Sequence, residues 1–129
     1  MLSDYPVGAA LAVSDLSRAR AFYEDVLGFT PAEIRPETEE VAYRAGEGTW
    51  FFVYVTASAG TNQATAAAFR VADLDATVAE LRSRGVRFAE YDLPGLKTVD
   101  SIAIQADGTR VAWFPDPDGN VIGLDQLPA

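Results

Sequence analysis

AALAVSDL (residues 9–16) and AAFRVADL (residues 67–74) are two copies of one pattern, placed 58 residues apart along the chain. Five positions are identical between the copies: Ala9, Ala10, Val13, Asp15 and Leu16 match Ala67, Ala68, Val71, Asp73 and Leu74. Each copy lies where a short apolar strand (7–13 and 66–71) leads into a segment with apolar residues at helical spacing. The helices are expected to end at Gly28 and Gly85. The repeat predicts two modules of the same fold.

The segments after each helix predict further strands. In the first half they lie at about 31–35, 41–45 and 49–56; in the second half they lie at 85–91, in a hairpin that turns at Asp107-Gly108, and at 120–126. The fold class is therefore α+β, with two βαβββ modules whose curved sheets surround a cleft and whose helices cover the outer faces. We expect a single domain over residues 1–129, with module 1 at about 5–56, a linker at about 57–65 and module 2 at about 66–127.

Composition excludes several classes of function. The 129 residues include no histidine and no cysteine, which excludes imidazole or thiolate metal ligands and Ser-His or Cys-His nucleophile pairs. The formal net charge of -9 opposes binding to nucleic acid and to anionic membranes, and it favours a cationic ligand. No apolar stretch is long enough to span a membrane, and we expect a cytoplasmic location.

Three segments resemble one known family. VSDLSRARAFYEDVLGF (13–29), AFRVADLDATVAELRSRGVRF (68–88) and FPDPDGNVIGLDQ (114–126) are similar to the vicinal oxygen chelate superfamily. This superfamily contains glyoxalase I, extradiol dioxygenases, fosfomycin-resistance enzymes and bleomycin-resistance proteins. Its members share a scaffold and differ in chemistry, so the resemblance implies the fold more than the reaction. It also implies a homodimer.

The resemblance identifies the positions at which metal-binding members carry their ligands. Carried onto this chain, those positions are Gly8, Ala66, Gly123 and, by internal symmetry, Val53. None of these side chains can bind a metal, because a divalent cation needs several oxygen, nitrogen or sulfur ligands. We therefore expect no metal and no cofactor, and no metal-dependent glyoxalase or dioxygenase activity.

Strand alternation predicts which side chains face the cleft. The predicted ligand-binding residues are Gly8, Ala10, Phe51, Val53, Ala66, Ala68, Arg70, Trp113, Gly123 and Asp125. Many of them are small, which would leave room for a flat organic molecule or, alternatively, let sheets or a partner chain approach closely. Arg70 is expected either to pair with Asp125 or to bind a ligand anion. Trp113 and Phe114 are adjacent, so at most one of them is expected to face the cleft.

Three functions are compatible with these residues. The first is a metal-independent protein that holds a small molecule in the cleft, as the drug-sequestering resistance members do. This molecule would be apolar or aromatic, and either cationic or neutral. The second is a metal-free isomerase, cyclase or lyase that uses a cleft carboxylate such as Asp125 as base and Arg70 to stabilise negative charge. The third is a member that serves only to pair with another chain.

Overall fold

The computed structural model describes all residues from 1 to 129 and divides into two compact units. Unit 1 comprises residues 1–63 together with Pro117–Asn120; unit 2 comprises residues 64–116 and 121–129. Both combine a four-stranded sheet with one main helix, which confirms the α+β class predicted from the sequence. The cleft between modules stays a prediction, as does the single domain. No helix is both long enough and apolar enough to cross a membrane.

Unit 1 contains β1 (Ala9–Val13), α1 (Leu16–Arg20), β2 (Pro31–Arg35), β3 (Glu40–Arg44) and β4 (Trp50–Val55). The helix continues past α1 as a π-helical segment, Ala21–Val26, and ends before Gly28, whose φ of 85° favours glycine. Asp15 caps α1, because its side chain accepts a hydrogen bond from the backbone N of Arg18. Short 3-10 turns lie at Leu2–Asp4, Pro36–Thr38 and Gly46–Gly48.

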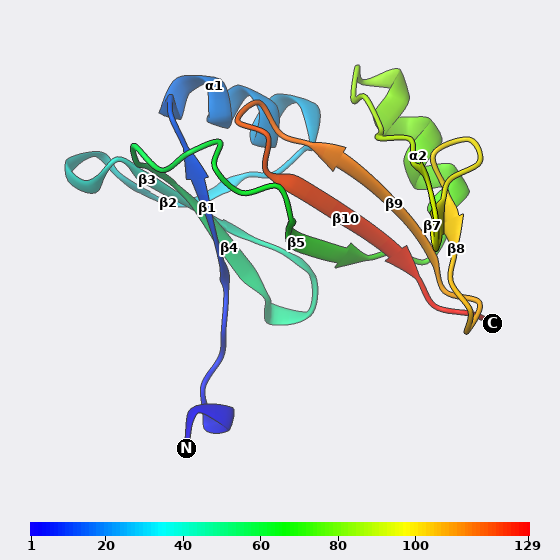
Figure 1. Ribbon diagram of the computed structural model, residues 1–129. Helices are drawn as coiled ribbons and strands as arrows, with labels where there is room; N and C mark the ends of the chain where they lie inside the picture. Colours follow the sequence, from blue (N-terminus) through cyan, green and yellow to red (C-terminus); the bar gives the residue numbers. More distant parts are fainter. The chain divides into compact units, whose positions relative to one another are not determined.

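The sheet of unit 1 has the strand order β1-β4-β3-β2. β1 and β4 are parallel, and the other two pairs are antiparallel. Figure 1 shows α1 lying across one face of this sheet. The core on that face is formed by side chains that are almost fully buried, namely Leu11, Val13, Ala19, Tyr23, Val41, Tyr43, Phe51 and Val53. The opposite face, called here the open face of unit 1, carries no helix.

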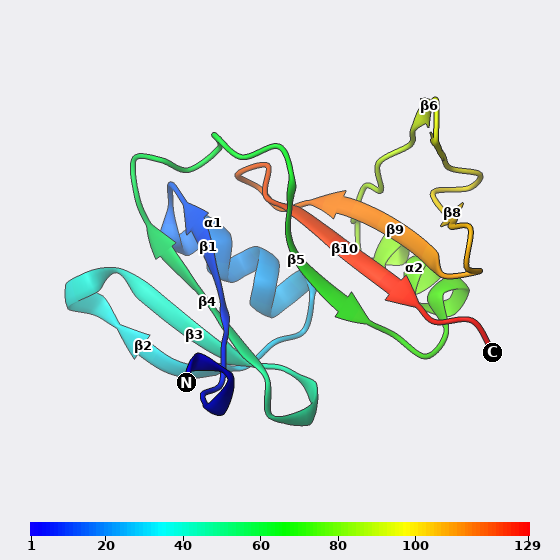
Figure 2. The same cartoon turned by 60° about the horizontal axis from the view of Figure 1, so that its bottom comes forward.

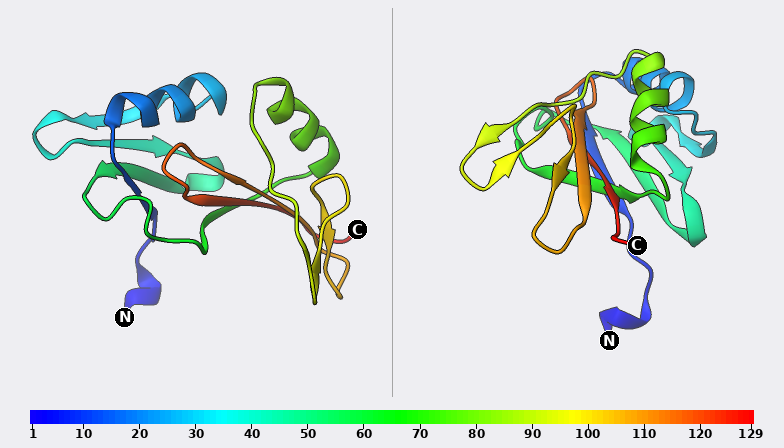
Figure 3. Two further views of the ribbon diagram at one scale, coloured as in Figure 1. Left: turned by 45° about the horizontal axis from the view of Figure 1, so that its top comes forward. Right: turned by 90° about the vertical axis from the view of Figure 1, so that its right-hand side faces the viewer.

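Unit 2 contains β5 (Thr65–Arg70), α2 (Leu74–Ser83), β6 (Asp92–Leu93), β7 (Leu96–Lys97), β8 (Ala103–Ile104), β9 (Arg110–Pro115) and β10 (Val121–Gln126). Its main sheet has the order β5-β10-β9-β8, with β5 and β10 parallel, so it repeats the topology of unit 1. Figure 2 shows α2 behind β9 and β10, and β6 at the tip of a separate two-stranded hairpin. Two turned views in Figure 3 show the same helix-on-sheet arrangement within each unit.

One predicted strand of unit 2 is absent. Residues 85–91 form no strand and make one backbone hydrogen bond to β9, from Ala89 N to Trp113 O at 2.8 Å. The end of this segment bonds to the chain that follows it instead, because Thr98 N donates to Tyr91 O and Ser101 N donates to the Glu90 carboxylate. The hairpin predicted at Asp107-Gly108 is present between β8 and β9, and Gly108 has a φ of 91°.

Candidate functional site

The open face of unit 1 is lined by aromatic side chains from β4. Trp50 and Phe52 stack with their ring centroids 5.9 Å apart and an interplanar angle of 14°, and Phe52 packs against Tyr54 at 5.9 Å. β1 supplies small neighbours to this row, since Ala10 pairs with Phe52 and Ala12 pairs with Tyr54. The result is an aromatic row beside alanines, on a face that no helix covers.

The predicted orientation of Phe51 and Val53 is wrong. Both side chains lie in the core, with exposed fractions of 4% and 0%, and Phe51 packs against the rings of Tyr23, Phe29 and Tyr43. The error is a shift of one residue, which reverses every face along a strand. Consequently the unit 1 counterpart of Gly123 is not Val53.

Strand pairing identifies the correct counterpart. Gly123 pairs with Ala68 in unit 2, and Phe52 pairs with Ala10 in unit 1, while Ala10 and Ala68 are equivalent positions of the sequence repeat. Phe52 therefore occupies the place that symmetry assigns to a fourth metal ligand. Its phenyl ring offers a stacking surface and no ligand atom.

A cavity of about 690 Å³ opens on the same face of unit 1. Residues of β2, β3 and β4 and of the turn before β4 line it: Ala32, Glu33, Arg35, Glu40, Ala42, Tyr43, Arg44, Ala45, Gly48, Thr49, Trp50 and Phe52. Trp50 and Phe52 supply the aromatic wall, and the alanines leave space beside it. We name this hollow the β2–β4 cavity. Its size is in the range of cavities that hold small organic ligands.

Gly8 has no side chain, and the indole of Trp50 occupies the space that a side chain there would need. A Cβ atom at position 8 would lie 2.5 Å from two ring atoms of Trp50, Cδ2 and Cε3, which no side chain can do without moving the indole. The indole thus fills the space that the first metal ligand would need. Trp50 also stacks on Phe52, and its exposed fraction is 38%.

Charged side chains gather at two places along the β2–β4 cavity. Arg35 donates to both carboxylate oxygens of Glu33, from Nε at 2.9 Å and from Nη2 at 3.1 Å, and its Nη1 lies 4.0 Å from the Glu40 carboxylate. The pKa of Glu33 is lowered by its hydrogen bond from Arg35. Arg44 lies at the other end of β3, where it pairs in register with Trp50.

Three of the predicted cleft residues of unit 2, Ala68, Trp113 and Gly123, lie together. A Cβ at Gly123 would be 3.4 Å from Thr65 Cγ2, 3.6 Å from Ala68 Cβ and 3.7 Å from Trp113 Cδ1, so these groups share one face of the sheet. Trp113 packs edge-to-face against Tyr91 at 5.5 Å. Phe114 points the other way and is buried, as the alternation of adjacent residues predicts.

Arg70 and Asp125 form an ion pair with two hydrogen bonds. Arg70 Nε donates to Oδ1 at 2.9 Å and Nη2 donates to Oδ2 at 3.3 Å. The Asp125 side chain is 23% exposed, whereas the Arg70 side chain is 62% exposed. Since both Asp125 oxygens already accept hydrogen bonds from Arg70, this geometry offers no support for Asp125 as a catalytic base.

A second polar network joins the helix of unit 1 to its sheet, and sequence reasoning missed it. Arg20 Nε donates to Glu24 Oε2 at 2.7 Å, and the hydroxyl of Tyr43 donates to the same oxygen at 2.9 Å. The hydrogen bond from Arg20 lowers the pKa of Glu24, while burial and the hydrogen bond to Glu24 raise the pKa of Tyr43. The i,i+4 spacing of Arg20 and Glu24 along a predicted helix could have indicated their ion pair. Nothing in the local sequence indicates that Tyr43 on β3 joins them.

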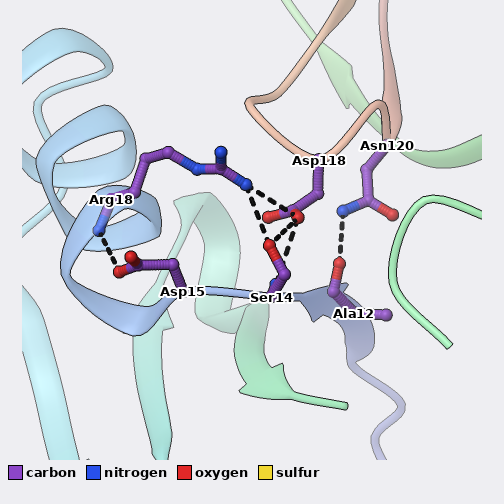
Figure 4. A network of polar contacts seen from close by, with 6 residues as sticks. All are labelled: Ala12, Ser14, Asp15, Arg18, Asp118 and Asn120. Atoms are coloured by element: carbon purple, nitrogen blue, oxygen red, sulfur yellow. Dashed lines mark hydrogen bonds and ion pairs between the residues drawn. The ribbon is translucent and has the colours of Figure 1, made fainter. Parts of the chain in front are cut away.

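The turn Pro117–Asn120 belongs to unit 1 and is tied to the loop between β1 and α1, as Figure 4 shows. Asp118 Oδ1 accepts hydrogen bonds from Ser14 N at 3.1 Å, from Ser14 Oγ at 2.6 Å and from Arg18 Nη2 at 3.0 Å. Asn120 Nδ2 donates to Ala12 O at 2.8 Å. The Asp-Pro-Asp-Gly segment is thus a structural turn, and Ser14 binds Asp118 instead of capping the helix.

The residues of this chain do not fit the metal that the fold family implies. Gly8, Ala66, Gly123 and Phe52 present only hydrogen or carbon at the four ligand positions. Elsewhere, too, no group of three or more aspartate or glutamate side chains is arranged to hold a metal ion. The four positions therefore offer no ligand atom to a metal ion.

Solved structures of similar fold cover almost the whole chain. A glyoxalase / bleomycin resistance protein from Catenulispora acidiphila is 26% identical with a TM-score of 0.70, over 95% of this chain and 98% of that one. TnmS3, an antibiotic-binding protein from a Streptomyces species, is 27% identical with a TM-score of 0.70, over 96% of both chains. A lactoylglutathione lyase from Agrobacterium tumefaciens is 18% identical with a TM-score of 0.68, over 95% and 92% of the two chains, and shows the fold alone.

No curated protein matches the sequence. The family model described as the Glyoxalase/Bleomycin resistance protein/Dioxygenase superfamily matches residues 7–124, which include the strands and helices of both sheets. The match confirms the resemblance on which the sequence analysis relied. Because this match covers nearly the whole length and both copies of the internal repeat, the chain belongs to the Glyoxalase/Bleomycin resistance protein/Dioxygenase superfamily.

Proposed function

We propose that this protein is a metal-independent small-molecule-binding protein that holds a flat, apolar or aromatic compound in the β2–β4 cavity. The observation that carries the proposal is the stacked pair of Trp50 and Phe52 along a cavity of about 690 Å³. Aromatic walls of this kind bind planar ligands by offset stacking and by excluding water. The proposed ligand contacts on β4 are thus Trp50 and Phe52, in place of the buried Phe51 and Val53.

Two further findings support it. TnmS3, which is 27% identical over nearly the whole chain, is an antibiotic-binding protein, so this scaffold can bind an antibiotic. In addition, the ligand positions of the family's metal site hold Gly8, Ala66 and Gly123 in this chain, and Trp50 fills the space above Gly8. A binding role needs no metal, which agrees with this composition.

The remaining predicted contacts are part of the same proposal. Ala10 lies beside Phe52 on unit 1. Ala66, Ala68, Trp113 and Gly123 lie on unit 2, and their role as ligand contacts stays a prediction. Arg70 and Asp125 form their ion pair on the same unit. A homodimer and a cytoplasmic location stay expectations.

Two single-tryptophan variants test where a ligand binds. The chain has two tryptophans, so Trp113→Phe leaves Trp50 as the only indole reporter, and Trp50→Phe leaves Trp113. Titration with a panel of planar aromatic natural products should quench fluorescence in Trp113→Phe, with weaker or no quenching in Trp50→Phe. Failure of every compound to bind more tightly than about 1 mM, some 4 kcal/mol of binding free energy, would reject the proposal.

Native mass spectrometry before and after chelator treatment tests metal independence. We expect any co-purified organic mass to survive the chelator, and no stoichiometric metal to be lost, because the chain offers no convergent ligand set. A metal that leaves with the chelator and takes the ligand with it would contradict this part of the proposal.

A further inference from the structure

Arg44 is a cation without an acidic partner at the edge of the β2–β4 cavity. Of the ten lysine and arginine side chains, six form ion pairs with carboxylates: Arg18, Arg20, Arg35, Arg70, Arg84 and Arg110. Among the other four, only Arg44 lines this cavity. Its guanidinium therefore keeps its donors available to a ligand, in a chain where acids outnumber bases by nineteen to ten.

The two ends of the cavity differ in charge. Arg35 is already shared between Glu33 and Glu40, so that end holds two carboxylates and one cation. Arg44 follows Glu40 by four residues along β3, which separates their Cα atoms by about 13 Å at roughly 3.3 Å per residue. This separation exceeds the screening length of about 8 Å at physiological ionic strength, so the Glu40 carboxylate acts only weakly on Arg44.

The aromatic wall brings a ligand to this charge. Arg44 and Trp50 are register partners on β3 and β4, and both side chains lie on the open face of unit 1. A planar ligand stacked along Trp50 and Phe52 would place a substituent on its edge within reach of the guanidinium. Arginine donates two parallel hydrogen bonds to a carboxylate or a similar planar anion, which fixes both the position and the orientation of that group.

We infer that the β2–β4 cavity selects planar aromatic ligands that carry an anionic group, and that Arg44 binds that group beside the Trp50–Phe52 wall. The inference rests on the proposed function and adds the chemical class of its ligand. It reverses the expectation from net charge, which favours a cation. The charge of -9 is spread over the whole surface and is screened by salt, whereas Arg44 contacts the ligand directly.

Three anthracene derivatives with one ring system and different charges test the inference: anthracene-9-carboxylate, 9-anthracenemethanol and 9-(aminomethyl)anthracene. Binding is followed by the fluorescence anisotropy of the anthracene. The unmodified protein should bind the carboxylate about tenfold more tightly than the amine, as expected for a charge-assisted bidentate contact. Arg44→Gln should remove most of that preference and affect the neutral alcohol far less.

A matched control uses Arg87, a second arginine that forms no ion pair and does not line the cavity. Arg87→Gln removes the same charge from unit 2, so it tests whether net charge alone sets the preference, and it should leave the tenfold ratio unchanged. If none of the three compounds binds, the inference is overturned, and the panel of natural products decides the proposed function separately. If all bind but the carboxylate has no advantage, or if its advantage survives in Arg44→Gln, only the inference is overturned.

Discussion

Gly8 and Gly123 both stand where metal-binding relatives carry a ligand, but different physical reasons keep each of them small. At Gly8 a Cβ would collide with the Trp50 indole at 2.5 Å. At Gly123 a Cβ would make ordinary contacts at 3.4 to 3.7 Å with Thr65, Ala68 and Trp113. The first glycine is required by a packed aromatic ring, whereas the second leaves room that a methyl group could occupy.

We therefore predict opposite outcomes for two equivalent substitutions. Gly8→Ala should displace Trp50 from Phe52, which shifts the tryptophan emission spectrum and weakens binding of planar ligands about tenfold, by analogy with the loss of one stacking contact. Gly123→Ala should change neither property and should alter stability by less than about 1 kcal/mol. Equal effects of the two substitutions on the emission spectrum would show that Trp50 is not held by Gly8.

At the scale of elements, the turn Pro117–Asn120 is hydrogen-bonded to the loop between β1 and α1 and to the start of α1. Asp118 is only 5% exposed in its side chain and accepts three hydrogen bonds, one of them from the Arg18 guanidinium. Asp118→Ala should lower the free energy of unfolding by about 2–3 kcal/mol, measured by urea denaturation, because these donors lose a charged acceptor. Asp118→Asn keeps an acceptor oxygen and should cost less.

Another turn provides the control for this prediction. Asp107, between β8 and β9, accepts a hydrogen bond from Thr109 N within its own turn. Asp107→Ala should therefore cost about 1 kcal/mol, the usual contribution of one hydrogen bond. A cost for Asp118→Ala no larger than this would mean that its bonds to the β1–α1 loop add nothing to stability.

The Arg20–Glu24–Tyr43 network predicts two pH limits for the stability of unit 1. The pKa of Glu24 lies below its ordinary 4.5 in the folded state, mainly through the hydrogen bond from Arg20, so its contribution is present above about pH 4.5 and is lost as the pH falls below that. The pKa of Tyr43 lies above its ordinary 10.0, mainly through burial, so the unfolded chain ionises first and stability falls as the pH rises past 10.

Variants of the two residues separate these limits. In urea denaturation from pH 3 to pH 11, Glu24→Gln should flatten the fall in unfolding free energy on the acid side. Tyr43→Phe should flatten the fall on the alkaline side, which is at most about 1.4 kcal/mol per pH unit for one proton. An acid limb that stays as steep in Glu24→Gln as in the unmodified protein would assign the acid transition to other carboxylates.

The sequence predicted most elements but not every face. Alternation assigned β1 correctly because small and large residues alternate there, as in Ala10, Leu11, Ala12 and Val13. It failed for β4, where Trp50, Phe51, Phe52, Val53 and Tyr54 are all apolar or aromatic, so hydrophobicity does not mark the buried side. Residues 85–91 have strand composition but lack a partner over their length, and strand composition alone cannot supply one.

The same limit applies to the site. The resemblance assigned ligand positions to Gly8 and Gly123. The neighbours of these positions became visible only once strand register placed Trp50 over Gly8 and Arg44 beside Trp50. The Arg70–Asp125 pair was one of two alternatives from the sequence, and only the side-chain geometry decides between them. Contacts between segments far apart in the chain leave no mark on local composition.

At the scale of the whole molecule, the first seven residues carry exposed apolar side chains that are relevant to the oligomeric state. They extend beyond β1 in Figure 1 and include four of the ten large apolar side chains that are exposed: Met1, Leu2, Tyr5 and Val7, with exposed fractions of 86%, 76%, 68% and 87%. An arm of this composition gains free energy when a second surface removes it from water. This agrees with the homodimer that the family resemblance implies.

We predict that light scattering at micromolar concentration gives a mass near twice the 13.8 kDa of one chain. Replacing Leu2, Tyr5 and Val7 together by serine should shift the mass toward that of a single chain, because the arm loses the apolar area that association would bury. Ile104→Ser, at a side chain of unit 2 that is 72% exposed, serves as the control and should leave the mass unchanged. A monomeric unmodified protein would refute the homodimer, whereas a dimer that persists in the triple variant would locate its interface away from the arm.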